Sequence, residues 1–208
     1  EVATVPVWAK LTPNITHIAD PGLSALRAGA NGLAAINTIL SVMGVDLETL
    51  RPQPTVEGFS VPGGYSCKAI RPIALRMVME LARMMEDGFQ DRTISGIGGI
   101  ESGEDAAQFI LLGASTVQVC TGVMISGYGM VKEMSESLLA FMEKHDFETI
   151  DDFRGVSIPY FSTHADLVER QAKAKAEAKA RRDGMIEKDA QWSGDDFVEQ
   201  SDKLVSND

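Results

Sequence analysis

The amino-acid sequence predicts an α/β fold that forms the C-terminal half of a TIM (β/α)8 barrel, strands 5–8, followed by a helical, acidic C-terminal extension. Short apolar runs alternate with helix-length amphipathic segments, a helix–glycine–strand unit recurs, and glycines or polar residues follow the apolar runs. A complete barrel repeats strand and helix eight times in about 250 residues. Four such units are too few for a barrel or a doubly wound sheet, so half a barrel fits best.

Four short runs have the composition of buried parallel strands, because they are apolar and rich in β-branched residues. They are Val5–Leu11, Gly32–Ile39, Thr93–Ile97 and Thr116–Met124.

Two segments between these runs show helical periodicity. Ile73–Met85 places its apolar residues on one face and is followed by Gly88, which is typical of a helix stop. Ser102–Leu112 begins with a residue that caps helices and is followed by Gly113.

An internal repeat supports this alternation. In both Leu26–Asn37 and Ile110–Thr121 a helix ends at a Gly-Ala pair, a strand begins two residues later, and a polar residue closes the strand. In parallel α/β folds the carboxyl ends of the strands carry the ligand. We therefore expect the functional residues at these strand ends.

The chain of 208 residues has a formal net charge of −11, which is unevenly distributed. We expect a ligand-binding half-barrel over residues 1–145, a connecting segment with a charged helix over 146–182, and an acidic tail over 183–208. The helix is rich in Ala, Lys and Gln and should be solvated. The tail is either a solvated extension or an arm along a partner subunit, with Trp192 and Phe197 as contacts.

Composition excludes several classes of protein. The negative charge argues against binding to nucleic acid or to an anionic membrane, since both require clustered Lys and Arg. Cys67 and Cys120 cannot supply the four thiolates of an iron–sulfur cluster or a disulfide framework. No apolar stretch approaches 18 residues and the N-terminus lacks the pattern of a signal peptide. These features predict a cytoplasmic protein, and a chain that starts inside a fold.

Lys10 stands in an otherwise apolar strand and is a candidate for binding an anion at the barrel mouth. The alternative is a structural ion pair with a neighbouring carboxylate. Asn14, shortly after this strand, could contact a ligand or cap the next helix.

Asn37 and Thr38 end the second strand. An amide offers one acceptor and two donors in a single plane, which matches the edge of a heterocycle such as a pyrimidine. Asn and Thr also commonly finish strands without any ligand.

The third strand ends in a glycine-rich turn that includes Gly98 and Gly99, and a helix begins near Ser102. Backbone N–H groups and the helix N-terminus together favour a phosphate site. The alternative is a tight turn without a ligand. Cys120 and Thr121, at the end of the fourth strand, add further donors beside it.

The connection Ile39–Ala69 is rich in Pro and Gly and is predicted to be a lid or a binding loop. Gly63 and Gly64 suggest that backbone passes close to a ligand there. Cys67 is predicted to be a small buried residue rather than a nucleophile.

Five motifs carry a family resemblance. They are WAKLTPN (Trp8–Asn14), AAINT (Ala34–Thr38), PGGYS with KAIRPIALR (Pro62–Arg76), GIGGI (Gly96–Ile100) and VQVCTG (Val117–Gly122). Together they resemble the flavin-binding catalytic barrel of dihydropyrimidine dehydrogenases, of the bacterial NAD-dependent catalytic-subunit type, over residues 1 to about 170. They are similar, more loosely, to dihydroorotate dehydrogenases.

The resemblance implies an FMN-dependent oxidoreductase of pyrimidine catabolism that reduces the 5,6-double bond of uracil or thymine with electrons from NAD(P)H. By position, Lys10 would stabilise the negative charge of the reduced flavin as a catalytic residue. Asn37 and Thr38 would bind the pyrimidine. The residues that would hold FMN are Lys10, Gly64, Gly98, Gly99, Cys120 and Thr121.

The resemblance also implies missing parts. In the family the acid that protonates the substrate is a cysteine on a loop after the fourth strand, upstream of the residues present here. The cysteine-rich cluster segments are absent too, so an oligomer with a partner subunit carrying FAD, the NAD(P)H site and iron–sulfur clusters is expected. The alternatives are a dihydroorotate dehydrogenase-like flavoenzyme and a non-catalytic half-barrel that self-associates and binds phosphate.

Overall fold

The computed structural model describes residues 3–190, and the surroundings of side chains through Asp183. The chain divides into two compact units, the first ending at Tyr160 and the second beginning at Phe161. Of the predicted acidic tail, residues 191–208 lie outside the described residues, together with Trp192 and Phe197.

A four-stranded parallel sheet forms the centre of the first unit. Its strands are β1 (Trp8–Leu11), β2 (Gly32–Ala35), β7 (Thr93–Ile97) and β8 (Thr116–Gln118), and they are neighbours in that order. Spatial order follows chain order without the reversal that defines a doubly wound sheet. The prediction of an α/β fold with a parallel sheet is confirmed.

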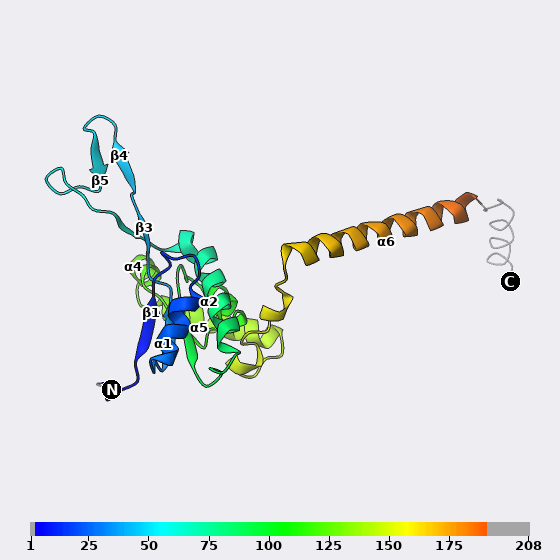
Figure 1. Ribbon diagram of the computed structural model, residues 1–208, viewed down its shortest axis with the longest axis horizontal. Helices are drawn as coiled ribbons and strands as arrows, with labels where there is room; N and C mark the ends of the chain where they lie inside the picture. Colours follow the sequence, from blue (N-terminus) through cyan, green and yellow to red (C-terminus); the bar gives the residue numbers. More distant parts are fainter. Residues whose placement is uncertain (1–2, 191–208) are drawn as a thin grey trace, which may run out of the picture. The chain divides into compact units, whose positions relative to one another are not determined.

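Helices connect the parallel strands. They are α1 (Ala19–Arg27), α2 (Arg71–Met85) and α3 (Gly103–Leu111), and α1 and α2 lie side by side (Figure 1). Right-handed crossovers that always add the next strand on the same side place their helices on one face of the sheet. The core between them contains Leu33, Leu81 and Phe109, each fully buried.

The predicted helix boundaries are present. The Ser102 hydroxyl accepts a hydrogen bond from the Asp105 N–H at 3.1 Å and caps α3. Gly29, Gly88 and Gly113, which follow α1, α2 and α3, have φ values of 98°, 105° and 104°. Only glycine adopts such a backbone at low cost, which explains the recurring helix–glycine–strand unit.

The fourth predicted strand is wrong in its second half. The run Thr116–Met124 is a strand only to Gln118, and Thr121–Ser126 forms α4. Met124 and Ile125 are 82% and 70% exposed rather than buried in the sheet. An apolar run alone does not distinguish a buried strand from a short helix.

The connection after β2 was predicted as a loop but contains four short strands. β3 (Ile39–Ser41) pairs antiparallel with β6 (Gly63–Tyr65), and β4 (Gly44–Asp46) pairs antiparallel with β5 (Arg51–Gln53). Figure 1 shows the β4–β5 end of this arm (residues 39–65) standing clear of the helices. Its density of Pro and Gly argues against strands in a sequence-based prediction, although edge strands tolerate both.

After α4, the helix α5 (Met130–Lys144) packs on α3. A second apolar cluster lies between them and the short 3-10 turn at Ile150–Asp152, whereas the 3-10 turn at Ile158–Tyr160 contributes Ile158 to the first core. Phe153 is fully buried at the centre of the second cluster and stacks on Phe147 with ring centroids 5.2 Å apart.

The second unit contains α6 (His164–Ala190), which includes the helix predicted in segment 146–182. Its side chains through Asp183 are exposed, except that Asp166 is half-buried. The pKa of Asp166 lies below its ordinary value because Arg170 and then Ser162 donate hydrogen bonds to its carboxylate. No helix within residues 3–190 combines the length and apolar character needed to cross a membrane.

Candidate functional site

A cavity of about 150 Å³ lies where the carboxyl ends of the four parallel strands meet. All but one of the site residues predicted from the sequence line it. They are Lys10, Asn37, Thr38, Gly98, Gly99, Cys120 and Thr121. The remaining predicted residue, Gly64, lies in β6 and is absent from the lining.

Lys10 is the only cationic residue that lines the cavity within the described chain. It belongs to β1, opposite Ala34 of β2, and its side chain is exposed. No carboxylate of the described residues lies within ion-pair distance of it. Its ammonium group is therefore available to an anion, rather than bound in the structural ion pair that was the alternative.

The hydrogen bonds of Asn37 show which part of its amide is left for a ligand. Its backbone N–H donates to the Leu11 carbonyl at 2.9 Å, which ties it to the end of β1. Its Oδ1 accepts from the N–H of Thr38 at 2.9 Å. No hydrogen bond within residues 3–190 uses the two N–H donors of the Asn37 amide, so they remain for a ligand.

Asn14 neither caps α1, whose N-cap position is Ile18, nor lines the cavity. Its Nδ2 donates to the Thr38 carbonyl at 3.2 Å, and its Oδ1 accepts from the Leu40 N–H at 2.8 Å. Asn14 therefore holds the segment that carries Thr38.

Gly64 lies against the side chain of Thr38 in the same segment. A Cβ at this position would overlap the side chain of Thr38, with 2.7 Å between it and the Thr38 Cβ. Only glycine lets β6 pass this close, so Gly64 influences the site through Thr38.

The turn at Gly98–Gly99 lies directly against the start of α2. Gly98 and Gly99 have φ values of 145° and 73°. A Cβ on Gly99 would lie 2.7 Å from the Cys67 carbonyl oxygen, and one on Gly98 would lie 2.7 Å from the Ala74 Cβ. Both positions require glycine for their conformation and for space.

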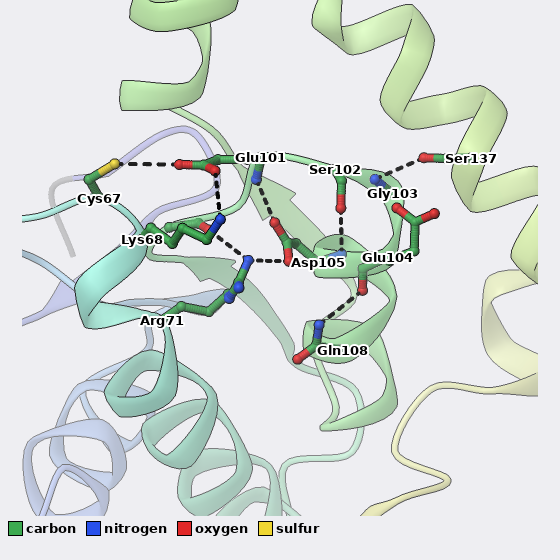
Figure 2. A network of polar contacts seen from close by, with 11 residues as sticks. Cys67, Lys68, Arg71, Glu101, Ser102, Gly103, Glu104, Asp105, Gln108 and Ser137 are labelled. Atoms are coloured by element: carbon green, nitrogen blue, oxygen red, sulfur yellow. Dashed lines mark hydrogen bonds and ion pairs between the residues drawn. The ribbon is translucent and has the colours of Figure 1, made fainter.

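The N-terminus of α3 differs from the anion site that the sequence suggested, because protein groups already occupy its donors (Figure 2). The Glu101 N–H donates to Asp105 Oδ2 and the Gly103 N–H to Ser137 Oγ, both at 3.0 Å. The pKa of Glu104 is lowered, first by its own backbone N–H and then by the Ser102 hydroxyl. Three carboxylates surround this helix start, so the glycine turn and the Cys120–Thr121 segment are the better phosphate donors.

Prediction from the sequence missed several residues that line the cavity. Gln118 lines the cavity, and its Nε2 donates to Ser95 Oγ at 2.9 Å. Ser95 is 2% exposed and also accepts from Thr116 Oγ1 at 3.0 Å. Thr116 and Gln118 lie two apart in β8, so their shared strand face was the signal for this polar cluster.

Glu101 brings a negative charge to the cavity lining. It accepts a hydrogen bond from the Cys67 thiol at 3.5 Å, and its other oxygen lies 3.8 Å from Lys68 Nζ (Figure 2). Cys67 is half-buried and Cys120 is exposed, and both are free thiols.

A family model described as dihydroorotate dehydrogenase matches residues 1–142. A chloroplastic dihydropyrimidine dehydrogenase (NADP(+)) of Arabidopsis thaliana is 58% identical over 206 residues, 99% of this chain and 48% of the relative. The NAD-dependent dihydropyrimidine dehydrogenase subunit PreA of Escherichia coli K12 is 44% identical over 155 residues, 74% of this chain and 37% of the relative. The catalytic subunit of dihydroorotate dehydrogenase B (NAD(+)) of Pyrococcus horikoshii is 39% identical over 158 residues, 76% of this chain and 49% of the relative. The chain thus spans half or less of the length of these relatives.

Proposed function

Because the chain belongs to the dihydroorotate dehydrogenase family, we propose that the protein carrying it is an FMN-dependent oxidoreductase. Its reaction is reduction of the 5,6-double bond of uracil or thymine with electrons from NAD(P)H. The observation that carries this proposal is the cavity that joins Lys10, the Asn37 amide and the Gly98–Gly99 turn at the strand ends.

The cavity favours a neutral pyrimidine base over dihydroorotate. A carboxylate-bearing substrate requires a cation or additional amides near Asn37, whereas Lys10 is the one cation lining the described part of the site. The higher identity to the dihydropyrimidine dehydrogenases points the same way.

The residues present fit FMN. The Gly98–Gly99 turn lines the cavity without side chains, and with Cys120 and Thr121 it offers backbone donors to a phosphate. Lys10, which has no carboxylate partner in the part of the chain that the structure describes, fits the electron-rich N1/O2 edge of the flavin ring. When bound, FMN supplies hydride transfer.

The chain's own residues orient the substrate and stabilise charge. The free amide donors of Asn37 bind a carbonyl of the pyrimidine ring, and the Thr38 hydroxyl adds a second polar contact beside them. Asn14 and Gly64 keep Thr38 in place. Lys10 stabilises negative charge that develops in the cavity, where a preorganised cation is worth more than in water.

We further propose that the parallel sheet corresponds to strands 5–8 of a barrel and that other residues complete the site. Two features support this. The outer edges of β1 and β8 have no strand partner within residues 3–190. The cavity of about 150 Å³ is also smaller than the roughly 300–1,000 Å³ of ordinary small-molecule sites. The other half would supply the proton donor, and a partner subunit with FAD, an NAD(P)H site and iron–sulfur clusters would supply electrons.

Cofactor analysis and turnover of the intact protein test the proposal. We expect flavin absorbance at about 450 nm, release of FMN on denaturation, and reduction of uracil in preference to turnover of dihydroorotate. Preference for dihydroorotate would support the dihydroorotate dehydrogenase alternative. A protein that binds inorganic phosphate but neither FMN nor a pyrimidine would support the non-catalytic half-barrel.

Substitution of Lys10 tests its role within that reaction. K10M should lower kcat by at least about a hundredfold, because a preorganised charge next to the reacting system is removed. K10R retains the charge, so its kcat should fall less than that of K10M. Equal activity of K10M and the unmodified protein would exclude a catalytic role for Lys10.

A further inference from the structure

We propose that the Arg71–Asp105 ion pair is a positioning device that orients the Gly99–Ile100 peptide toward the cavity. The pair thereby selects a phosphorylated flavin over an unphosphorylated one. This inference rests on the FMN site proposed above.

Arg71 acts from outside the cavity, since it does not line it. It is the first residue of α2, and its side chain is 21% exposed. A cation at a helix N-terminus is opposed by the helix dipole, so α2 itself does not stabilise it there. Its guanidinium is held instead by two acceptors, the Asp105 carboxylate and the Gly99 carbonyl, the latter at 3.4 Å (Figure 2).

Asp105 completes the contact to the other side of the turn. Its side chain is 12% exposed, and while Oδ1 meets Arg71, Oδ2 accepts from the Glu101 N–H at 3.0 Å. The pair therefore binds the carbonyl of Gly99 and the N–H of Glu101, the groups on either side of Ile100.

The consequence for the site follows from peptide geometry. In a trans peptide the C=O and N–H point in opposite directions. Because the Gly99 carbonyl points toward Arg71, the N–H of Ile100 points away from Arg71. Gly99 and Ile100 line the cavity and Arg71 does not, so we infer that this N–H faces the cavity. No hydrogen bond joins this N–H to another residue in the part of the chain that the structure describes. It is a free donor.

Without the pair, the turn can present the wrong group. Rotation of the Gly99–Ile100 peptide changes ψ of Gly99 and φ of Ile100. Gly99, which lacks a Cβ, does not oppose this rotation, whereas the β-branched Ile100 limits it to a partial turn. A partly rotated peptide would turn the Ile100 N–H away from the phosphate and bring the Gly99 carbonyl oxygen, with its partial negative charge, closer to it. The ion pair opposes this rotation by binding that oxygen on the far side.

The test compares the affinities of FMN and riboflavin, which differ only in the phosphate, for the apo form of the intact protein. We expect R71M and D105N each to weaken the binding of FMN about tenfold, which is the effect of losing one hydrogen bond to a charged group. The Kd of riboflavin should change less than about threefold, because the ring contacts lie elsewhere. The double variant should bind FMN no more weakly than either single variant, because both substitutions remove the same contact. R71K, which keeps the charge but not the planar fork, should recover part of the preference.

The controls separate positioning from folding. Arg76 lies on the same helix in an exposed pair with Glu80, so R76M should leave both affinities unchanged. D105N keeps an oxygen that can accept from the Glu101 N–H. This variant provides the affinity comparison if R71M does not fold. An unchanged ratio of the FMN and riboflavin affinities in R71M and D105N would overturn the inference while leaving the FMN site intact. An unmodified apoprotein that binds neither flavin would overturn both the proposed function and this inference.

Discussion

At the residue scale, hydrogen bonds inside the protein decide which atoms remain for a ligand. Asn37 and Asn14 are both amides near strand ends. The amide donors of Asn37 are free of partners among the described residues, while Asn14 uses both ends of its side chain on the Thr38–Leu40 segment. Residue type and position in the sequence were similar, and only the partners distinguish a ligand-binding amide from a positioning one.

Replacement of Asn14 tests this difference. N14A should raise the KM for the pyrimidine several-fold with a smaller change in kcat, because Thr38 is no longer held although the reacting groups remain. The free energy of unfolding should fall by about 1–2 kcal/mol, measured by chemical denaturation. Q108A, on the exposed face of α3, is a control that should change neither quantity. A fall in stability without any change in KM would show that Asn14 is purely structural.

Glu101 should oppose the proposed phosphate. E101Q removes a negative charge from the cavity lining and frees Lys68 from its ion pair. The affinity for FMN should therefore rise about threefold at low salt and less at high salt. Riboflavin should bind as before, because it carries no charge. Weaker FMN binding by E101Q would indicate that Glu101 orders the start of α2 instead.

At the element scale, close helix packing depends on single glycines. Gly103 begins α3, and a Cβ there would overlap the Ser137 hydroxyl and the backbone of α5. The sequence suggested a capped helix at this place but contained no local signal for the contact with Ser137 of α5, which lies 34 residues later.

Substitution of this glycine should separate the two helices. G103A should lower the free energy of unfolding by about 1–3 kcal/mol, since backbone atoms must move to accommodate the methyl group. The matched control is G129A, because Gly129 precedes α5 with helical angles and has nothing within 4 Å of its added Cβ. Equal stability of the two variants in urea denaturation would contradict the predicted contact.

At the scale of the whole molecule, the buried core belongs to the first unit. The buried hydrophobic residues of the described chain all precede Tyr160, and α6 exposes its side chains through Asp183. A helix of this composition relies on its own propensity and on pairs such as Asp166–Arg170 rather than on a core.

Loss of this pair should therefore lower the helix content of α6. D166A removes the carboxylate that accepts hydrogen bonds from Arg170 and Ser162 near the start of the helix, so circular dichroism of the intact protein should show a small loss of helical signal. E169A, exposed on the same helix, is the control and should show no such loss. An unchanged signal in D166A would show that the pair does not support α6.

The sequence by itself determined the alternation of strands and helices, the glycine stops and seven of the residues that line the cavity. These depend on local periodicity, on backbone angles that only glycine adopts readily, and on the convergence of parallel strand ends, which brings Lys10, Asn37 and Gly98 to one edge. The predictions for the arm and for the end of β8 were wrong because short apolar runs do not reveal their conformation. Only the tertiary structure decided that Gln118 lines the site, that Asn14 positions Thr38, and that Arg71 joins Asp105. Each of these depends on partners more than twenty residues apart, and nothing in the local pattern specifies such a distant partner.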